Sequence, residues 1–203
     1  TTAQKQILSD SIIELVNKKN DYNQKIDLLQ KNIKEIYATK FDETIELAKF
    51  GFKLANEKND NLNKGDFLRT IGLSLGKKGK IDSASIYYYR ALKVLEPTKN
   101  AEKLGLLYDD MARMYRKLRQ PKRALEFYEK ALQLYEKEKN LEGIARINNE
   151  SGVVFRDEGN YAEANKRFEK SLHIQQERKD SVGIGYALEF LGYNQLLIKD
   201  YKK

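Results

Sequence analysis

The residue types that most often carry chemistry are scarce in this chain. Its 203 residues include one histidine, His173, and no cysteine. Disulfides and thiolate metal sites are therefore excluded, and a transition-metal site would lack its usual ligands. His173 follows Ser171 and Leu172 within a helical pattern, so we interpret it as an exposed surface side chain. We predict no metal site and no cofactor.

A second candidate is the stretch Gly-Leu-Ser-Leu-Gly-Lys-Lys at residues 72–78. A phosphate-binding loop of the form G-x-x-x-x-G-K-[ST] needs its glycines one residue further apart, and Lys78 stands where a magnesium-binding Ser or Thr belongs. The stretch also lies inside a predicted helix rather than after a strand. We interpret Gly72 instead as the small residue at which two paired helices touch.

Carboxylates offer a third candidate. Asp109, Asp110 and Glu150 could form an acid–base pair, but nothing in the sequence predicts a desolvated cleft around them. Because no nucleophile, base or cofactor cradle can be assembled, we predict no catalytic residue and no enzyme activity.

Three consecutive tyrosines, Tyr87, Tyr88 and Tyr89, could stack nucleic-acid bases. Consecutive residues of a helix point to different faces, so the three rings cannot form one platform. Tyr88 recurs as an aromatic residue later in the chain and is predicted to be in the core. Tyr87 and Tyr89 are expected at the seam between repeats or on the outer surface.

The elements that would position these residues are helices. Residues 108–133 contain two apolar stripes at helical spacing, separated by a break at Gln120 and Pro121. Small and aromatic residues then recur every 40 residues. The recurring sets are Ala84, Ala124 and Ala164; Ala91, Ala131 and Ser171; Tyr88, Tyr128 and Phe168; and Gly72, Ala112, Gly152 and Gly192.

This order of residues resembles the tetratricopeptide (TPR) repeat, whose usual length is about 34 residues. Residues 143–164 are the most similar stretch, and the repeats here are the longer variety. The resemblance implies an all-α fold, a right-handed superhelical solenoid of antiparallel helix pairs with about ten helices.

We expect a single TPR-like array over residues 1–203. Its segments are a leading helix at 3–18, a degenerate repeat at 21–57, repeats at 62–96, 99–138 and 141–178, and the first helix of a truncated repeat at 181–203. The apolar residues Leu188, Leu191, Leu196 and Leu197 of that last helix would lack a partner helix. We therefore expect the chain to be a fragment with more repeats or another domain beyond Lys203, or to form a homo-oligomer through this open helix.

Composition limits the other classes of function that we considered, namely nucleic-acid binding and membrane insertion. The net charge is +8, but the lysines are spread along the chain with acidic residues between them, which indicates a solvated surface. Nucleic-acid binding through this basic surface is kept only as an alternative. No run of about 18 apolar residues is present, so we expect no membrane insertion in this segment. The compartment is not fixed; we favour the cytoplasm, with export or a periplasmic location as the alternative if an upstream signal segment was removed.

The resemblance also implies where a ligand would bind, because the first helix of each pair lines the inner wall of such arrays. The candidate ligand-binding residues come from the first helices of the three repeats after the degenerate one and from the last helix. They are Arg69, Leu73, Lys77, Asp109, Arg113, Arg116, Lys117, Asn149, Val153, Arg156, Asp157, Glu189 and Tyr193. Arginine is prominent and forms bidentate bonds to carboxylates. We therefore expect a protein or peptide ligand with acidic groups or a free C-terminus.

Members that clamp a chaperone's terminal carboxylate use lysine and asparagine at positions that are Arg69, Leu73 and Asp110 here, which argues against that activity. Long-repeat arrays also resemble the sensing or scaffolding parts of bacterial signalling regulators. We therefore expect a non-catalytic protein- or peptide-binding module of such a regulator, whose partner could be an output domain of the same polypeptide. The alternatives are a self-associating scaffold without a peptide ligand and an inner wall that binds nothing.

Overall fold

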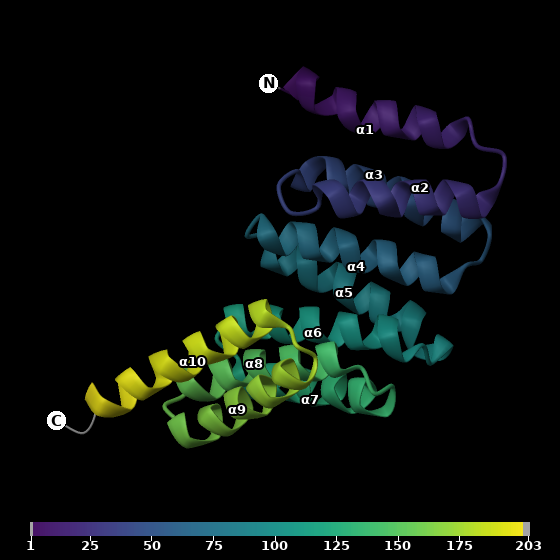
Figure 1. Cartoon of the computed structure of the whole chain (residues 1–203). Helices are drawn as coiled ribbons and strands as arrows, with labels where there is room; N and C mark the ends of the chain where they lie inside the picture. Colours follow the sequence, from purple (N-terminus) through teal and green to yellow (C-terminus); the bar gives the residue numbers. More distant parts are fainter. Residues whose placement is uncertain (1, 201–203) are drawn as a thin grey trace. The chain divides into compact units, whose positions relative to one another are not determined.

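The computed structural model describes the backbone of residues 2–200 and the side chains of residues 8–199. Over that backbone it contains ten α-helices, one short 3-10 helix and no strand (Figure 1). The predicted all-α class, with about ten helices, is confirmed. The chain divides into two compact units, residues 1–103 and 104–203, which are described separately.

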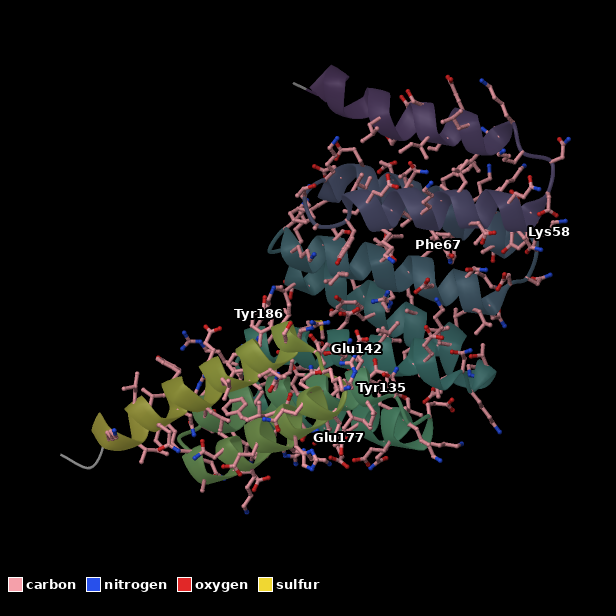
Figure 2. All side chains as sticks on the ribbon, in the orientation of Figure 1. Lys58, Phe67, Tyr135, Glu142, Glu177 and Tyr186 are labelled. Carbon is pink, nitrogen blue, oxygen red and sulfur yellow. The ribbon has the colours of Figure 1, made fainter. Side chains whose placement is uncertain are left out.

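Unit 1 contains five α-helices. They are α1 (Thr2–Asn17), α2 (Tyr22–Ile36), α3 (Phe41–Glu57), α4 (Asn61–Lys77) and α5 (Ile81–Leu95), followed by the 3-10 helix η1 (Glu96–Thr98). Its core includes Val16, Leu29, Leu47 and Phe67, each 1% exposed or less. Phe67, labelled in Figure 2, packs its ring against Gly51, so α3 and α4 approach closely at this point.

Unit 2 contains four complete helices and most of a fifth. Helix α6 (Ala101–Lys117) starts at the end of unit 1 and continues into unit 2, and it is followed by α7 (Pro121–Lys137), α8 (Leu141–Asp157), α9 (Tyr161–Glu177) and α10 (Ser181–Asp200). The rings of Tyr115 and Phe127 stack with centroids 5.4 Å apart between α6 and α7. Those of Phe168 and Phe190 stack at 5.3 Å between α9 and α10.

From α3 onward, the turns between helices have one geometry that repeats every twenty residues. Each contains one residue in the left-handed region, with φ between 53° and 78°: Asn59, Gly79, Lys99, Arg119, Lys139, Gly159 and Lys179. In six of these turns the next amide donates to the carbonyl five residues before it, as Lys80 does to Leu75 at 2.9 Å. This is the Schellman ending of a helix, which reverses the chain within three residues. After Lys99 the Asn100 amide donates instead to Thr98 Oγ1 at 3.2 Å.

Helix starts are also periodic. Asp60, Asn100, Asn140 and Asp180 each accept a hydrogen bond from the backbone amide three residues later, at 2.9–3.0 Å. Each of them precedes the first helix of a pair. Its side chain bonds one of the backbone amides that have no hydrogen-bond partner at the start of a helix. Asn160 caps α9 in the same way, because its side chain accepts from the Glu163 amide at 3.2 Å.

Glycines mark where paired helices touch. A Cβ on Gly72 would lie 2.8 Å from the Tyr88 ring, and one on Gly152 would lie 2.5 Å from the Phe168 ring. Tyr88 and Phe168 are 3% and 0% exposed. The interpretation of Gly72 as a contact residue, and of Tyr88 as a core residue, is therefore confirmed. That all repeats form one array remains a prediction.

Candidate functional site

The candidate residues of unit 2 fall on matching stripes of three first helices. Asp109, Arg113 and Arg116 of α6 are spaced four and three residues apart, which places them on one helix face. Asn149, Val153 and Arg156 repeat the spacing on α8, and Glu189 and Tyr193 begin it on α10. We call these residues, with Lys117, the first-helix wall.

Neighbouring first helices are joined by an ion pair at this wall. Arg146 of α8 donates from Nε to Oδ2 of Asp109 on α6 at 2.9 Å. Its Nη2 donates to the Tyr135 hydroxyl at 3.0 Å, and its guanidinium lies 5.6 Å from the centre of that ring. Arg146 was not among the predicted site residues.

Asp109 is the centre of a buried charge network. Arg113 donates from Nη2 to Asp110 Oδ1 at 2.8 Å and to Asp109 Oδ2 at 3.4 Å. The side chains of Asp109 and Asp110 are both 1% exposed. We expected no desolvated environment around these carboxylates, and their burial in the structure corrects that interpretation.

Burial raises the pKa of Asp109 from its ordinary value of 3.8 to about 6. The positive charges of Arg113 and Arg146 oppose this rise in pKa, whereas Asp110 and Glu150 add to it. Burial alone would lower the pKa of the Arg113 guanidinium, but the surrounding carboxylates outweigh burial and raise it. Arg113 therefore stays charged and fixed in place.

Glu150 completes the network from α8. Its Oε2 accepts a hydrogen bond from the Tyr128 hydroxyl at 3.3 Å and lies 3.5 Å from Arg116 Nη2. Its Oε1 lies 4.0 Å from Arg113 Nη1. Burial, followed by the charge of Glu150, raises the pKa of Tyr128 far above its ordinary value, so the phenol stays neutral and donates.

The network presents positive charge to solvent. The side chains of Arg113, Arg116 and Arg146 are 33–36% exposed, whereas those of Asp109 and Asp110 are 1% exposed. The carboxylates thus lie beneath the guanidinium groups. A ligand that approaches the wall meets arginine first, which favours carboxylate or other anionic groups.

Three buried polar atoms at the wall have no hydrogen-bond partner among the described residues. They are Oδ1 of Asp109, Nε of Arg116 and Oδ1 of Asn149. A buried polar atom without a partner costs free energy, about 1–3 kcal/mol.

The α10 part of the wall is aromatic. The Arg156 guanidinium lies 4.9 Å from the centre of the Tyr193 ring, and its Nη2 lies 3.7 Å from an oxygen of Asp157. Tyr193 is 51% exposed, Glu189 is exposed, and Val153 is buried at 8%. Tyr193 therefore offers an open ring face or edge next to a cation.

The remaining three candidates lie in unit 1, on one stripe of α4. Arg69 and Leu73 are half-buried and Lys77 is exposed. Arg69 Nε lies 3.4 Å from Asp66 Oδ1, and Lys77 Nζ lies 4.5 Å from the centre of the Tyr37 ring. These contacts position both cations within unit 1.

The other sequence candidates lie outside the wall. The His173 side chain is 72% exposed and lies 3.6 Å from Glu177, which confirms its interpretation as a surface residue. Residues 72–77 lie inside α4, so the glycine-rich stretch is no phosphate loop. Tyr87 is half-buried and Tyr89 is 46% exposed, as predicted. Among the described helices, none is both long and apolar enough to cross a membrane.

Comparison with protein families adds one decisive match. Residues 63–137, which span α4 to α7, match the model of the tetratricopeptide repeat. Residues 63–137 are therefore similar to tetratricopeptide repeats. The match covers two helix pairs, α4 with α5 and α6 with α7, and does not include residues 143–164, the stretch that we interpreted as most similar from its sequence. No curated protein sequence matches the chain.

Solved structures extend the TPR likeness to nearly the whole chain. BtubC from P. vanneervenii has a TM-score of 0.79 at 18% identity, over 98% of this chain and 84% of its own. Aspartyl phosphate phosphatase F from Bacillus subtilis has the same TM-score at 13% identity, over 98% of this chain. A STAND protein from Pyrococcus horikoshii, described as having a tetratricopeptide repeat sensor, has a TM-score of 0.75 at 15% identity, over 89%.

The chain spans only 57% of the phosphatase and 29% of the STAND protein. At these identities the likeness shows the fold alone, a TPR-like helical solenoid.

Proposed function

We propose that this TPR chain is a non-catalytic protein-binding module whose first-helix wall in unit 2 binds an acidic segment of a protein or peptide. The observation that carries the proposal is the layering of charge, with exposed guanidinium edges above buried carboxylates. A surface lysine adapts to many partners, whereas a guanidinium held from below by two ion pairs is fixed before the ligand arrives. Such preorganisation lowers the entropy cost of binding.

The residues of the wall divide into two roles under this proposal. Arg113 and Arg146 neutralise Asp109 and Asp110, so they support the surface. Arg116 and Lys117 contact the ligand, because the Arg116 side chain is 35% exposed and Lys117 is exposed. Tyr193, held by Arg156, contacts an apolar side chain of the same ligand.

The wall has no catalytic role in this proposal. The raised pKa of Asp109 would suit an acid or base, but its Oδ2 is already bonded to Arg146 and no nucleophile of the wall lies beside it. The network therefore supports binding rather than proton transfer.

We place this module in a larger signalling or regulatory protein of bacterial type, as its sensing or scaffolding part. Support comes from the STAND protein, whose similar repeats are described as a sensor, and from the phosphatase, which is longer than this chain. An output domain of the same polypeptide is a partner of the same chemical class if it presents an acidic segment.

Amide NMR with the ¹⁵N-labelled chain tests the binding surface. The probe is a ten-residue peptide of alternating Glu and Gly with a free C-terminus, and the control replaces each Glu with Lys. We expect shift changes concentrated on α6 and α8 around Arg116 and Asn149, with none from the control. Changes spread over the second helices α7 and α9, or equal changes from both peptides, would refute the proposed surface.

A further inference from the structure

Glu150 is a partly exposed acid of the charge network. Its side chain is 25% exposed, whereas those of Asp109 and Asp110 are 1% exposed. It lies between two arginines of α6, because its Oε1 is 4.0 Å from Arg113 Nη1 and its Oε2 is 3.5 Å from Arg116 Nη2. Glu150 thus occupies a position near the solvent at which two guanidinium groups meet one carboxylate.

The contacts of Glu150 are longer than those of the buried carboxylates. A hydrogen bond between a guanidinium and a carboxylate is usually about 2.7–2.9 Å long. Arg113 Nη2 meets Asp110 Oδ1 at 2.8 Å, whereas Glu150 lies 3.5 and 4.0 Å from its two arginine nitrogens. The hydrogen bond that it accepts from the Tyr128 hydroxyl is 3.3 Å long. A partly exposed ion pair at such distances is weak, so another carboxylate can replace Glu150.

The helical repeat does not require an acid at this position. The equivalent residues in other first helices, at steps of forty, are Thr70, Asp110 and Phe190. Thr70 and Phe190 carry no charge, and Asp110 is buried. Because first helices form with a neutral or a buried side chain at this position, the partly exposed carboxylate of Glu150 is a feature of the first-helix wall rather than of the fold.

The buried part of the network does not depend on Glu150. Arg113 bonds Asp109 and Asp110 through Nη2, and Arg146 bonds Asp109 through Nε. The nitrogen of Arg113 that lies near Glu150 is the other one, Nη1. Arg113 therefore stays in place when its Nη1 exchanges one carboxylate for another.

We propose that Glu150 is an internal competitor of the acidic ligand. It occupies the carboxylate position between Arg113 and Arg116, and a carboxylate of the ligand takes that position as the flexible Glu150 side chain turns toward the solvent. Competition lowers the affinity for every carboxylate, so it favours segments that bind through several residues over isolated acidic groups. The proposal rests on the proposed function, because it concerns the same wall.

The affinity of a glutamine variant tests this competition. The probe is the ten-residue peptide of alternating Glu and Gly, labelled with fluorescein, and fluorescence anisotropy at pH 7.5 measures its binding to the 203-residue chain. Glu150→Gln removes the charge and keeps the shape and an acceptor for Tyr128, so binding should become about three- to tenfold tighter. Glu169→Gln removes the same charge from an exposed position of the second helix α9 and should change binding less than about twofold.

Two further variants separate competition from other roles of Glu150. Glu150→Ala should also tighten binding, whereas the loss of a residue that only positions the arginines would weaken it. In the Arg116→Gln background, Glu150→Gln should tighten binding less than about twofold, because one of the two guanidinium groups is gone. A full gain in that background would show general repulsion of the peptide and would overturn the competitor role.

The outcomes distinguish this proposal from the proposed function. Peptide binding by the natural chain that Glu150→Gln weakens or leaves unchanged overturns the competitor role alone. Absence of binding by both the natural chain and Glu150→Gln overturns the proposed function, and the competitor role with it. Binding that appears only in the variant supports both.

Discussion

The bond from Arg146 Nε to Asp109 Oδ2, 2.9 Å long, joins two consecutive repeats through a carboxylate that is 1% exposed. Charged side chains of this kind usually lie in solvent, and burying one requires a partner of opposite charge. Here the partner comes from the next first helix, so the repeat interface and the candidate binding wall depend on the same residues. Changes to this network should therefore affect both stability and ligand binding.

The stability of the chain should depend on the protonation of Asp109. Its pKa in the folded state, about 6, lies above the ordinary 3.8, so the fold favours the protonated form. The resulting stabilisation is present below about pH 4 and is lost as pH rises through 6. It amounts to about 2–3 kcal/mol, since one pKa unit corresponds to about 1.4 kcal/mol. Urea unfolding between pH 4.5 and 7.5 measures it.

Asp109→Asn is the matched control, because the amide cannot titrate and still accepts a bond from Arg146. The unfolding free energy of the variant should fall less than that of the natural chain over this pH range. Identical pH profiles for the two proteins would contradict the assignment of a raised pKa to Asp109.

Removing Arg113 should be far more costly than removing Arg116. Arg113→Ala leaves Asp109 and Asp110 buried with one guanidinium fewer, and breaking a buried pair costs about 3–5 kcal/mol. Arg116→Gln affects only the half-exposed pair with Glu150 and should cost less than about 1 kcal/mol. Urea midpoints at pH 7.5 compare them, and equal midpoints would mean that Arg113 does not support the network.

The two glycines in equivalent positions of α8 and α10 should respond in opposite directions. Gly152→Ala places a methyl group 2.5 Å from the Phe168 ring and should destabilise the chain by about 1–3 kcal/mol. Gly192→Ala meets no described atom and should stabilise α10 by about 0.5–1 kcal/mol. Thermal melts test both, and equal destabilisation by the two variants would contradict the contact assigned to Gly152.

The residues that precede the helices should contribute to stability only where their side chain accepts a hydrogen bond from a backbone amide of the helix. Asn140 accepts from the Gly143 amide at 2.9 Å, and Asn140→Ala should cost about 1 kcal/mol. Gln120 precedes α7 without a side-chain cap bond, so Gln120→Ala should change stability by less than about 0.5 kcal/mol. Equal losses in denaturant unfolding would argue that the cap bond contributes nothing.

Much of the fold could be predicted because its causes are local and repeated. The small residues at 72 and 152 and the aromatic rings at 88 and 168 recur at a fixed spacing, and this pattern predicts where two helices approach each other. The caps Asp60, Asn100, Asn140 and Asp180 carry the same 40-residue period and could have fixed the helix starts.

The buried network could not be predicted by residue type, because aspartate and arginine usually indicate a solvated face. A signal was nevertheless present in the spacing. Asp109 pairs with Arg146 at a separation of 37 residues, and Asp66 pairs with Lys103 at the same separation and 3.0 Å. Oppositely charged residues that are 37 positions apart in the sequence thus identify contacts between consecutive first helices. This separation is three residues shorter than the 40-residue repeat.

The affinity of an acidic peptide for charge-matched variants tests the central claim most directly. Arg116→Gln/Lys117→Gln removes two positive charges from the first-helix wall, and Lys166→Gln/Lys170→Gln removes two from the second helix α9, where both lysines are at least half exposed. Fluorescence anisotropy with the labelled Glu-Gly peptide should show binding at least tenfold weaker for the wall variant and less than twofold weaker for the α9 variant. Equal losses for both variants would mean that net charge, rather than the wall, attracts the peptide and would contradict the account.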